Sequence, residues 1–476
     1  MSDSRPVGVW YRGFDLRTAD HAALQHAAAN GSSLITFFVW NKAFEDSTKG
    51  GFPRVGPARQ RHLYIALEEL NESLHHLGHQ LHVQSGHPPD VVLALATALG
   101  LAEVVALRGT THEEMMEEHQ LLRALASEGI LLTLFEGDLL YDRHALPAMH
   151  GTSPPSFTTF RKKIEKAGST PPSPLPAPTV LPPAIPCEST FDVPRGQHPE
   201  APPPVDLGGC ITGKRHVHTY FEHPTLARTY KETRNGLLGR DYSTKFSIYL
   251  ATGAVSARQI AHRLADYEET HGANDSTYWI LFELLWREYF KWIGMHVGAR
   301  LFLTMGLAPP VPHSAQREGS VQGAGRMDLL TLHKWIIGET GIPFIDAAMI
   351  ELRTTGYLSN RMRQNVASFL VHHLGVRWTL GAAYFEHALI DYDPASNWGN
   401  WQYLAGVGTD PRNRVFNPIK QAKMYDPDGA YVVYWIPAFE SIPPAYRHVP
   451  WLMPKFERPS WYPRPMINPT RAFKMT

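Results

Sequence analysis

A proline-rich segment in the middle of the chain limits its possible folds more than any other feature. It reads TPPSPLPAPTVLPPAIP over residues 170–186, and further prolines follow up to Pro204. Because proline fixes φ and lacks a backbone N–H donor, such a run cannot form a helix interior or a central strand. It predicts an extended surface connector between two domains. We place the domains at residues 1–140 and 216–476, joined by a connector over residues 141–215.

The first domain alternates short strand-like and helix-like runs. Strands are expected at Val7–Arg12, Leu34–Trp40, Gln80–Gln84, Val104–Leu107 and Ile130–Phe135, with helices near Ala22–Ala29, Ala58–Leu77, Pro89–Leu99 and His112–Ser127. This alternation predicts an α/β domain with a parallel, five-stranded, Rossmann-like sheet covered on both faces. The first turn, WYRGFDLR, lacks G-x-G-x-x-G, which disfavours a dinucleotide bound to this sheet in the usual way. The second domain is predicted to be all-α.

The composition excludes several classes of protein. Lys plus Arg and Asp plus Glu each total 45, so any nucleic-acid contact must come from a local basic patch. The two cysteines, Cys187 and Cys210, offer no disulfide framework. The N-terminus lacks a signal-peptide pattern and no run of about 18 apolar residues occurs, so we expect a cytoplasmic protein that does not enter a membrane. The histidines lack metal-ligand spacing, so no metal site is expected.

One segment of the second domain places hydroxyls and a cation just before a helix-like run. It contributes Ser243, Thr244, Lys245 and Ser247. With the free N–H groups of a helix start, these side chains could form a phosphate site. They could equally be ordinary helix caps, and the spacing leaves both interpretations open. The nearby Ser256-x-x-Gln259 pattern is a capping box with a purely structural role.

A second motif is FELLWREYF, residues 282–290. Glu283, Trp286 and Arg287 fall at i, i+3 and i+4, so one helix face presents a carboxylate, an indole and a guanidinium. Such a face suits the wall of a polar cavity. The alternative is a partly buried ion pair beside a packed tryptophan, which is the commoner outcome for an isolated motif.

A third motif places Asn360, Arg363 and Gln364 on adjacent turns of one expected helix. Arg363 could pair with Asp391 or Asp393, and that pairing could be purely structural. The segment therefore offers a second polar helix face, whose partner the sequence leaves undecided.

The run SNWGNWQYLAGVGTD, residues 396–410, crowds large rings and amides into a short helix-like stretch. Trp398, Trp401 and Tyr403 surround Asn397 and Asn400 where a plain core helix would use leucine and alanine. This mixture suits a flat heteroaromatic guest that needs face stacking and hydrogen bonds at its edge.

Together these motifs resemble the photolyase/cryptochrome family, and most closely its cryptochrome-DASH branch. The agreement runs from Val7 to about Pro437, and NWGNWQYLAGVGTDPR followed by FNPIKQA is highly specific. The resemblance implies that the helical domain binds FAD. The implied cofactor contacts are Tyr230, Ser243, Thr244, Lys245, Phe246, Ser247, Arg287, Asn360, Arg363, Asp391, Tyr392, Asp393 and Asn397.

The resemblance also implies catalytic roles. Asn397 would face the flavin N5 nitrogen and tune it through a hydrogen bond. Trp401, Trp378 and Trp335 match the family's tryptophan chain, which reduces the flavin by light-driven electron transfer. Three ordinary core tryptophans are the alternative interpretation.

The implied activity is that of a deoxyribodipyrimidine photolyase, which uses light and FAD to split cyclobutane pyrimidine dimers. The damaged base pair would enter a pocket lined by Glu283, Trp286, Gln364 and Tyr403, with Asn360 beside them. The (6-4) photolyases carry histidines where this chain has Asn360 and Gln364, which favours cyclobutane dimers. We expect a monomer that prefers single-stranded DNA, because unstacking costs least there. The alternatives are a signalling photoreceptor without repair activity and a nucleic-acid-binding regulator.

Two departures from the family concern the antenna. The first-strand motif has one residue more than usual, and Gly109 stands where folate-carrying relatives have a glutamate that contacts the antenna. We therefore expect weak or absent binding of 5,10-methenyltetrahydrofolate.

Overall fold

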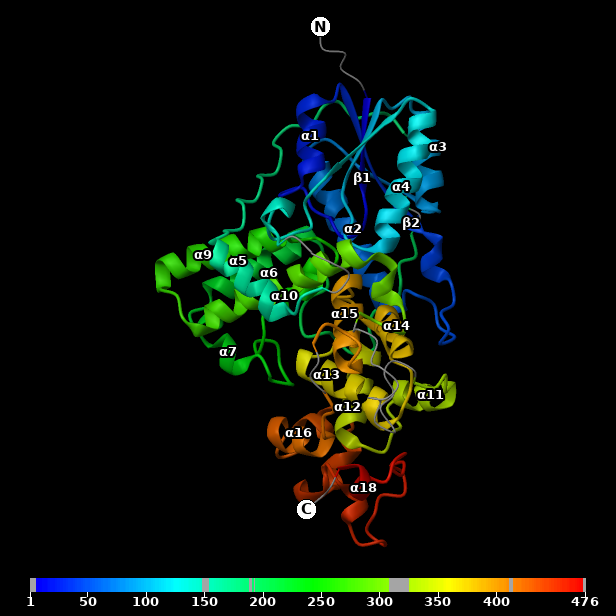
Figure 1. Ribbon diagram of the computed structural model, residues 1–476, viewed down its shortest axis with the longest axis vertical. Helices are drawn as coiled ribbons and strands as arrows, with labels where there is room; N and C mark the ends of the chain where they lie inside the picture. Colours follow the sequence, from blue (N-terminus) through cyan, green and yellow to red (C-terminus); the bar gives the residue numbers. More distant parts are fainter. Residues whose placement is uncertain are drawn as a thin grey trace.

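The chain folds into an α/β domain and a helical domain, at opposite ends of the molecule (Figure 1). The computed structural model describes residues 6–147, 154–187, 191, 193–307, 325–410 and 414–473. The predicted fold class is confirmed. Within the described residues, no helix is long and apolar enough to cross a membrane.

The α/β domain is built on a parallel five-stranded sheet with strand order β3-β2-β1-β4-β5. Its elements are β1 (Pro6–Tyr11), α1 (Ala22–Asn30), β2 (Ser33–Asn41), α2 (Pro57–His75), β3 (Leu81–Gly86), α3 (Pro88–Ala98), β4 (Glu103–Leu107), α4 (His112–Ser127) and β5 (Leu131–Phe135). Strand β1 is central and reads PVGVWY. Its side chains enter an apolar cluster on each face of the sheet, with Val9 in one and Trp10 in the other. Burial on both faces explains the continuous apolar run.

The connector contains a helix as well as an extended run. Helix α5 (Phe157–Ala167) precedes the prolines, and the helix after them, α6 (Cys210–Glu222), begins at Cys210. The extended run lies against the α/β domain. The N–H of Leu34 donates to the carbonyl of Pro183 over 2.9 Å, and the N–H of Ile185 donates to the carbonyl of Leu34 over 2.9 Å. Prolines here still offer carbonyl acceptors, which the β2 backbone uses.

The helical domain is a stack of mostly short helices around α10. They are α7 (Tyr230–Thr233), α8 (Ser247–Ala251), α9 (Ala257–His271), α10 (Asp275–Val297), α11 (Leu329–Ile337), α12 (Pro343–Thr355), α13 (Asn360–Ser368), α14 (Trp378–Ala388), α15 (Pro394–Ala405), α16 (Pro418–Tyr425), α17 (Ala430–Trp435) and α18 (Pro469–Phe473). The predicted capping box of α9 is confirmed: the N–H of Gln259 donates to Ser256 Oγ over 3.1 Å, and the Ser256 N–H donates back to Gln259 Oε1 over 2.9 Å.

Helix α15 packs closely between α10 and α14 because two glycines leave room for rings. A Cβ atom on Gly381 of α14 would lie 2.2 Å from the indole of Trp401. A Cβ atom on Gly399 of α15 would lie 2.2 Å from the ring of Phe290 on α10. These close approaches fix α15, and with it the aromatic and amide residues of the NWGNW run.

Candidate functional site

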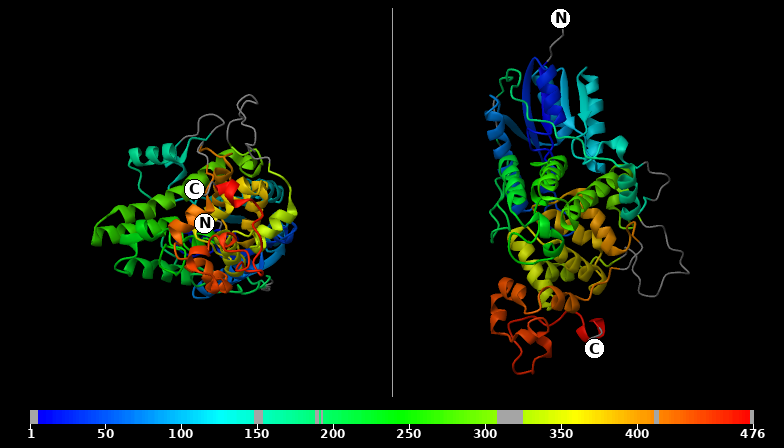
Figure 2. Two further views of the ribbon diagram at one scale, coloured as in Figure 1. Left: turned by 90° about the horizontal axis from the view of Figure 1, so that it is seen from below. Right: turned by 90° about the vertical axis from the view of Figure 1, so that its left-hand side faces the viewer.

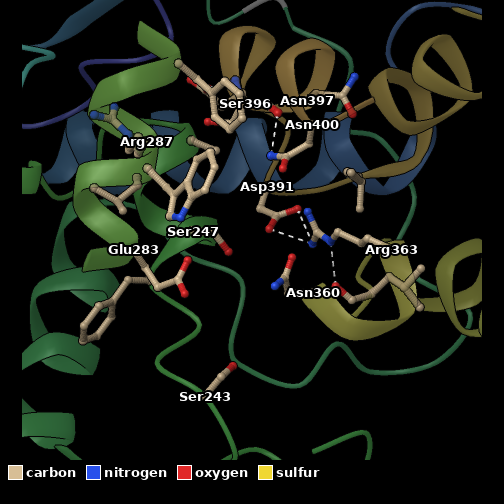
Figure 3. Close-up of a pocket in the computed structure, with 18 of the residues that line it drawn as sticks. Ser243, Ser247, Glu283, Arg287, Asn360, Arg363, Asp391, Ser396, Asn397 and Asn400 are labelled. Atoms are coloured by element: carbon tan, nitrogen blue, oxygen red, sulfur yellow. Dashed lines mark hydrogen bonds and ion pairs between the residues drawn. The ribbon is translucent and has the colours of Figure 1, made fainter. Parts of the chain in front are cut away.

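A cavity of about 520 Å³ lies inside the helical domain. Helices α10, α13 and α15 and the segment leading into α8 contribute its walls (Figure 3). Every predicted site residue lines it except Trp335 and Trp378, which are buried nearby in the core. The structure therefore brings together residues that are up to 173 positions apart, from Tyr230 to Tyr403.

One wall of the cavity carries an ion pair between α13 and the loop before α15. Arg363 Nη2 lies 2.9 and 2.8 Å from the two carboxylate oxygens of Asp391, as Figure 3 shows. Burial opposes the charge of Arg363, but Asp391 outweighs this and raises the pKa of the guanidinium. The sequence left Asp391 and Asp393 as alternative partners of Arg363, and the structure shows that Asp391 is the partner. An ion pair fixed at the cavity surface in this way can form hydrogen bonds with the polar edge of a bound ring system.

Asp393 belongs to a different ion network, which ties the cavity wall to the end of the α/β domain. It caps α15 by accepting the N–H of Ser396 over 2.7 Å, and it pairs with Lys291 of α10 over 2.5 Å. Lys291 also pairs with Asp138 over 2.7 Å, and Asp138 holds Arg287. Burial alone would raise the pKa of Asp393, but Lys291 and Arg287 lower it well below its usual value.

The segment before α8 faces the cavity with its hydroxyls. Among the described residues no side chain caps α8, so the capping interpretation of these hydroxyls is wrong. Lys245 has a left-handed backbone, with φ of 55°, and its side chain is buried. Its Nζ lies 3.0 Å from the ring centroid of Tyr242 and has no hydrogen-bond partner in the described chain. Burial lowers the pKa of Lys245 to about 6, because the charges of Glu351, Asp241 and Asp391 offset the loss of solvent only in part.

Asn397 is held at the cavity surface by α14. Its Nδ2 donates to the carbonyl of Ala382 over 3.0 Å, which leaves Oδ1 as the acceptor. The side chain is 8% exposed, so the amide has a fixed orientation in a largely dry site.

The three tryptophans of the predicted chain are all buried, and Trp401 alone lines the cavity. The ring centroids of Trp401 and Trp335 lie 6.4 Å apart, and Phe385 contacts both rings. Trp378 contacts a different indole, that of Trp398, at 5.7 Å. In the described core, two tryptophans of α15 therefore contact tryptophans of other helices: Trp401 contacts Trp335 of α11, and Trp398 contacts Trp378 of α14.

Trp286, Tyr403 and Glu283 make part of the cavity lining aromatic and charged. Trp286 stacks on Phe157 of α5, with ring centroids 3.7 Å apart and an angle of 13°, and meets Tyr403 edge-on at 5.5 Å. Glu283 is paired with Arg234, and burial raises the pKa of Glu283 above its usual value. One face of the Trp286 indole is therefore covered by Phe157.

Some lining residues were not among the predicted ones. Arg234, Ser396, Asn400 and Arg414 all reach the cavity. Arg234 lies four residues after Tyr230, so helical spacing gave a signal for it. The Lys291–Asp138 contact had no local signal, because its partners are far apart in sequence.

The adjacent histidines His372 and His373 contact backbone carbonyls. The ring nitrogens of His372 and His373 lie 2.7 and 2.9 Å from the carbonyl oxygens of Leu404 and Phe416. In the part of the chain that the structure describes, no group of three or more His, Cys, Asp or Glu side chains is placed to hold a metal ion.

Known proteins match this chain over nearly its whole length. The domain described as DNA photolyase matches residues 7–179, and the FAD binding domain of DNA photolyase matches residues 279–475. Cryptochrome DASH from Gloeobacter violaceus is 41% identical, over 98% of this chain and 93% of its own. The chain belongs to the photolyase/cryptochrome family. The resemblance inferred from the motifs is confirmed.

Further relatives agree in sequence and structure. Cryptochrome DASH from Xenopus laevis is 38% identical, over 92% of this chain and 84% of its own. The crystal structure of a cryptochrome from Synechocystis superposes with a TM-score of 0.91 at 36% identity, covering 100% of this chain and 99% of that one. A class III photolyase from Agrobacterium tumefaciens gives a TM-score of 0.82 at 27% identity, covering 99% and 96%.

The cavity fits the FAD that this family binds. Its volume of about 520 Å³ lies within the usual range of ligand sites, about 300–1,000 Å³. The buried Nζ of Lys245, which has no hydrogen-bond partner in the described chain, and the hydroxyls of Ser243 and Thr244 suit an anionic group. The Arg363–Asp391 pair and the amide of Asn397 match the polar edge of a flat ring system. The lining therefore fits the FAD that the matched domain binds.

A second cavity, of about 160 Å³, lies between the two domains. Arg12 and Gly13 after β1, Glu114 of α4 and Arg59 of α2 line it together with Glu386 of α14. Arg12 has a buried guanidinium that pairs with Glu118 and, over 3.4 Å, with Glu117. The loop after β1, which belongs to the first-strand motif, therefore lies in a polar and crowded space.

Proposed function

We propose that the protein uses blue light and FAD to split cyclobutane pyrimidine dimers, preferably in single-stranded DNA. The observation that carries the proposal is the continuity of one cavity. The residues suited to FAD and the residues Trp286, Tyr403 and Gln364 line the same cavity. A base that leaves its stack could therefore reach the cofactor without crossing protein.

FAD would be held by the hydroxyls at the start of α8, by the Arg363–Asp391 pair and by Asn397. Ser243, Thr244 and Ser247 would bind its phosphates, and the Arg363–Asp391 pair would border the ring system. Asn397, whose Nδ2 is held by Ala382, would present its Oδ1 to the flavin N5 position. When bound, FAD supplies light absorption and electron transfer.

The cavity residues Asn360, Gln364 and Trp286 favour a cyclobutane dimer as the bound lesion. Asn360 and Gln364 offer neutral amide groups at the cavity surface. Trp286 can stack on a base with the face that Phe157 leaves uncovered, a contact worth about 1–3 kcal/mol per base. This gain is comparable to the few kcal/mol that unstacking a base from a duplex costs. A protein of zero net charge adds no strong general attraction, so single strands should be the better substrate.

The Trp286→Ala variant tests this assignment. It should bind a dimer-containing single strand about 10-fold or more weakly, as the loss of roughly 1.4 kcal/mol of stacking implies. Its FAD content and flavin spectrum should match wild type, and Trp461→Ala, a change outside the cavity lining, should alter neither property. Two results together would favour the signalling photoreceptor. The Trp286→Ala variant would bind the dimer as tightly as wild type, and the wild type would split no dimer although its flavin is photoreduced normally.

We also propose that a folate antenna is weak or absent. A Cβ atom on Gly109 would lie 2.3 Å from Glu114 Cβ, so this packing has no room for a side chain there. The interdomain cavity of about 160 Å³ is below the usual size of a ligand site. Protein purified from a folate-replete host should show no stoichiometric methenyltetrahydrofolate, as measured by near-ultraviolet absorption and mass spectrometry of released cofactors. A near-stoichiometric amount would contradict the proposal.

A further inference from the structure

Helix α5 in the connector has one face buried against the cavity-lining helix and one face open to solvent. Phe157, Phe160 and Ile164, at i, i+3 and i+7, are at most 4% exposed. Phe157 stacks on Trp286, and Phe160 contacts Tyr289 at 5.4 Å, so α10 holds α5 in place. The helix ends at Ala167 and is capped by Gly168, which has φ of 63°.

The open face is strongly basic. Lys162, Lys163 and Lys166 are all exposed, and their spacing places them on neighbouring turns of one face. None of the three forms an ion pair with another described residue, whereas Arg161 pairs with Glu165 over 3.6 Å. In a chain of zero net charge, three adjacent uncompensated cations form a local positive patch.

The buried side of α5 lies against the lining of the larger cavity. Phe157 stacks on Trp286, the proposed stacking residue, and contacts Phe282, which also lines the cavity. In Figure 2, α5 (teal) projects from the body of the helical domain, so its outer face is accessible. Further guanidinium groups, those of Arg234 and Arg414, line the cavity itself.

We propose that the lysine face of α5 is a second nucleic-acid subsite, which binds the phosphodiester backbone of the strand that flanks the base in the cavity. The inference rests on the proposed function and adds a specific role for the connector. Each lysine neutralises a phosphate and releases its counterions, so the subsite contributes affinity that does not depend on base sequence.

The test compares two variants with the same decrease in positive charge. Lys162→Gln/Lys163→Gln/Lys166→Gln removes the α5 face, and Lys42→Gln/Lys49→Gln/Lys455→Gln removes three exposed lysines elsewhere. Each is titrated with dimer-containing single strands of about four and about twelve nucleotides, which span the usual single-strand site sizes, at several salt concentrations. FAD content and the flavin spectrum confirm that both variants are folded.

We expect the α5 variant to bind the longer strand more weakly, with a flatter dependence of log K on log salt, by roughly 0.7 for each phosphate that the variant no longer neutralises. The control variant should match wild type, and the short strand should bind all three proteins alike. Equal salt slopes for the two variants on the longer strand would overturn the inference. If the α5 effect is present but light splits no dimer, the proposed function fails and the α5 subsite stands.

Discussion

At the scale of single residues, Trp401 has the most demanding role. It lines the cavity, is 2% exposed, and contacts Trp335 and Phe385 in the core. Indoles oxidise readily, and a buried indole between the cavity and other aromatic rings can pass an electron onward. Its position is compatible with the proposed electron transfer and with an ordinary core tryptophan, and a substitution can separate the two.

Trp401→Phe should separate these two interpretations. Phenylalanine keeps most of the packing but is much harder to oxidise, so light-driven flavin reduction should slow by about tenfold or more, about 1.4 kcal/mol on the barrier. FAD should stay bound. The measurement is flavin absorbance during illumination with an external reductant, with Trp461→Phe as the control. A wild-type rate in Trp401→Phe would show that another route dominates.

The sequence predicted which residues gather at the cavity but not all of their pairings. Adjacent-turn spacing placed Asn360, Arg363 and Gln364 on one face, because helical period alone fixes that relation. The choice of Asp391 over Asp393 for Arg363 depends on Lys291, which reaches Asp393 from another helix. Such a choice follows from tertiary packing and has no local sequence signal.

At the scale of elements, α10 joins the cavity to the α/β domain. Lys291, 1% exposed, lies between the carboxylates of Asp138 and Asp393. Arg287 and Glu288 support the same junction, since Glu288 accepts the backbone N–H groups of Leu140 and Tyr141 over 2.9 and 3.0 Å. Burial raises the pKa of Glu288 to about 7. One helix thus positions both a cavity wall and the domain contact.

Lys291→Met should destabilise the protein strongly at neutral pH. It leaves Asp138 and Asp393 buried with less compensation, a loss of about 3–5 kcal/mol when one partner of a buried pair is removed. The lowered pKa of Asp393 stabilises the fold above its unfolded value of about 3.9, and that contribution disappears as pH falls towards the folded pKa. The difference in the free energy of unfolding between Lys291→Met and wild type should therefore become smaller at acid pH.

Urea unfolding of both proteins at neutral pH and at pH values below about 4, the unfolded pKa region of aspartate, measures this gap. Lys163→Met, at an exposed position, should change stability by no more than about 0.5 kcal/mol. A Lys291→Met protein as stable as wild type at neutral pH would show that the network contributes nothing to the domain junction.

Element positions in the first domain were well predicted, because strands buried on both faces alternate with amphipathic helices. All five expected strands overlap β1 to β5. Helix α5 was missed, although the spacing of Phe157, Phe160 and Ile164 is helical, because proline density dominated the interpretation of the connector. Helix α8 has five residues, too few to produce a periodic signal.

At the scale of the whole molecule, the α/β domain and the helical domain contribute differently to the structure. The helical domain contains the FAD cavity and its aromatic entrance, while the α/β domain is fixed to it through Asp138 and the loop after β1. Arg17 in that loop donates to the carbonyl of Gly253 over 3.0 Å. The sequence predicted two domains and a connector, but the contacts that hold them together appear only in the fold.

We propose that light, FAD and the open cavity together split pyrimidine dimers, and repair of one defined dimer can be measured. FAD-loaded protein is mixed with a single-stranded oligonucleotide that contains one cyclobutane dimer, and intact bases are quantified by chromatography after blue light or darkness. We expect recovery of the two pyrimidines in light alone, with many turnovers per protein and slower recovery from the same dimer in a duplex. Absence of splitting in light, by protein whose flavin is normally photoreduced, would contradict it.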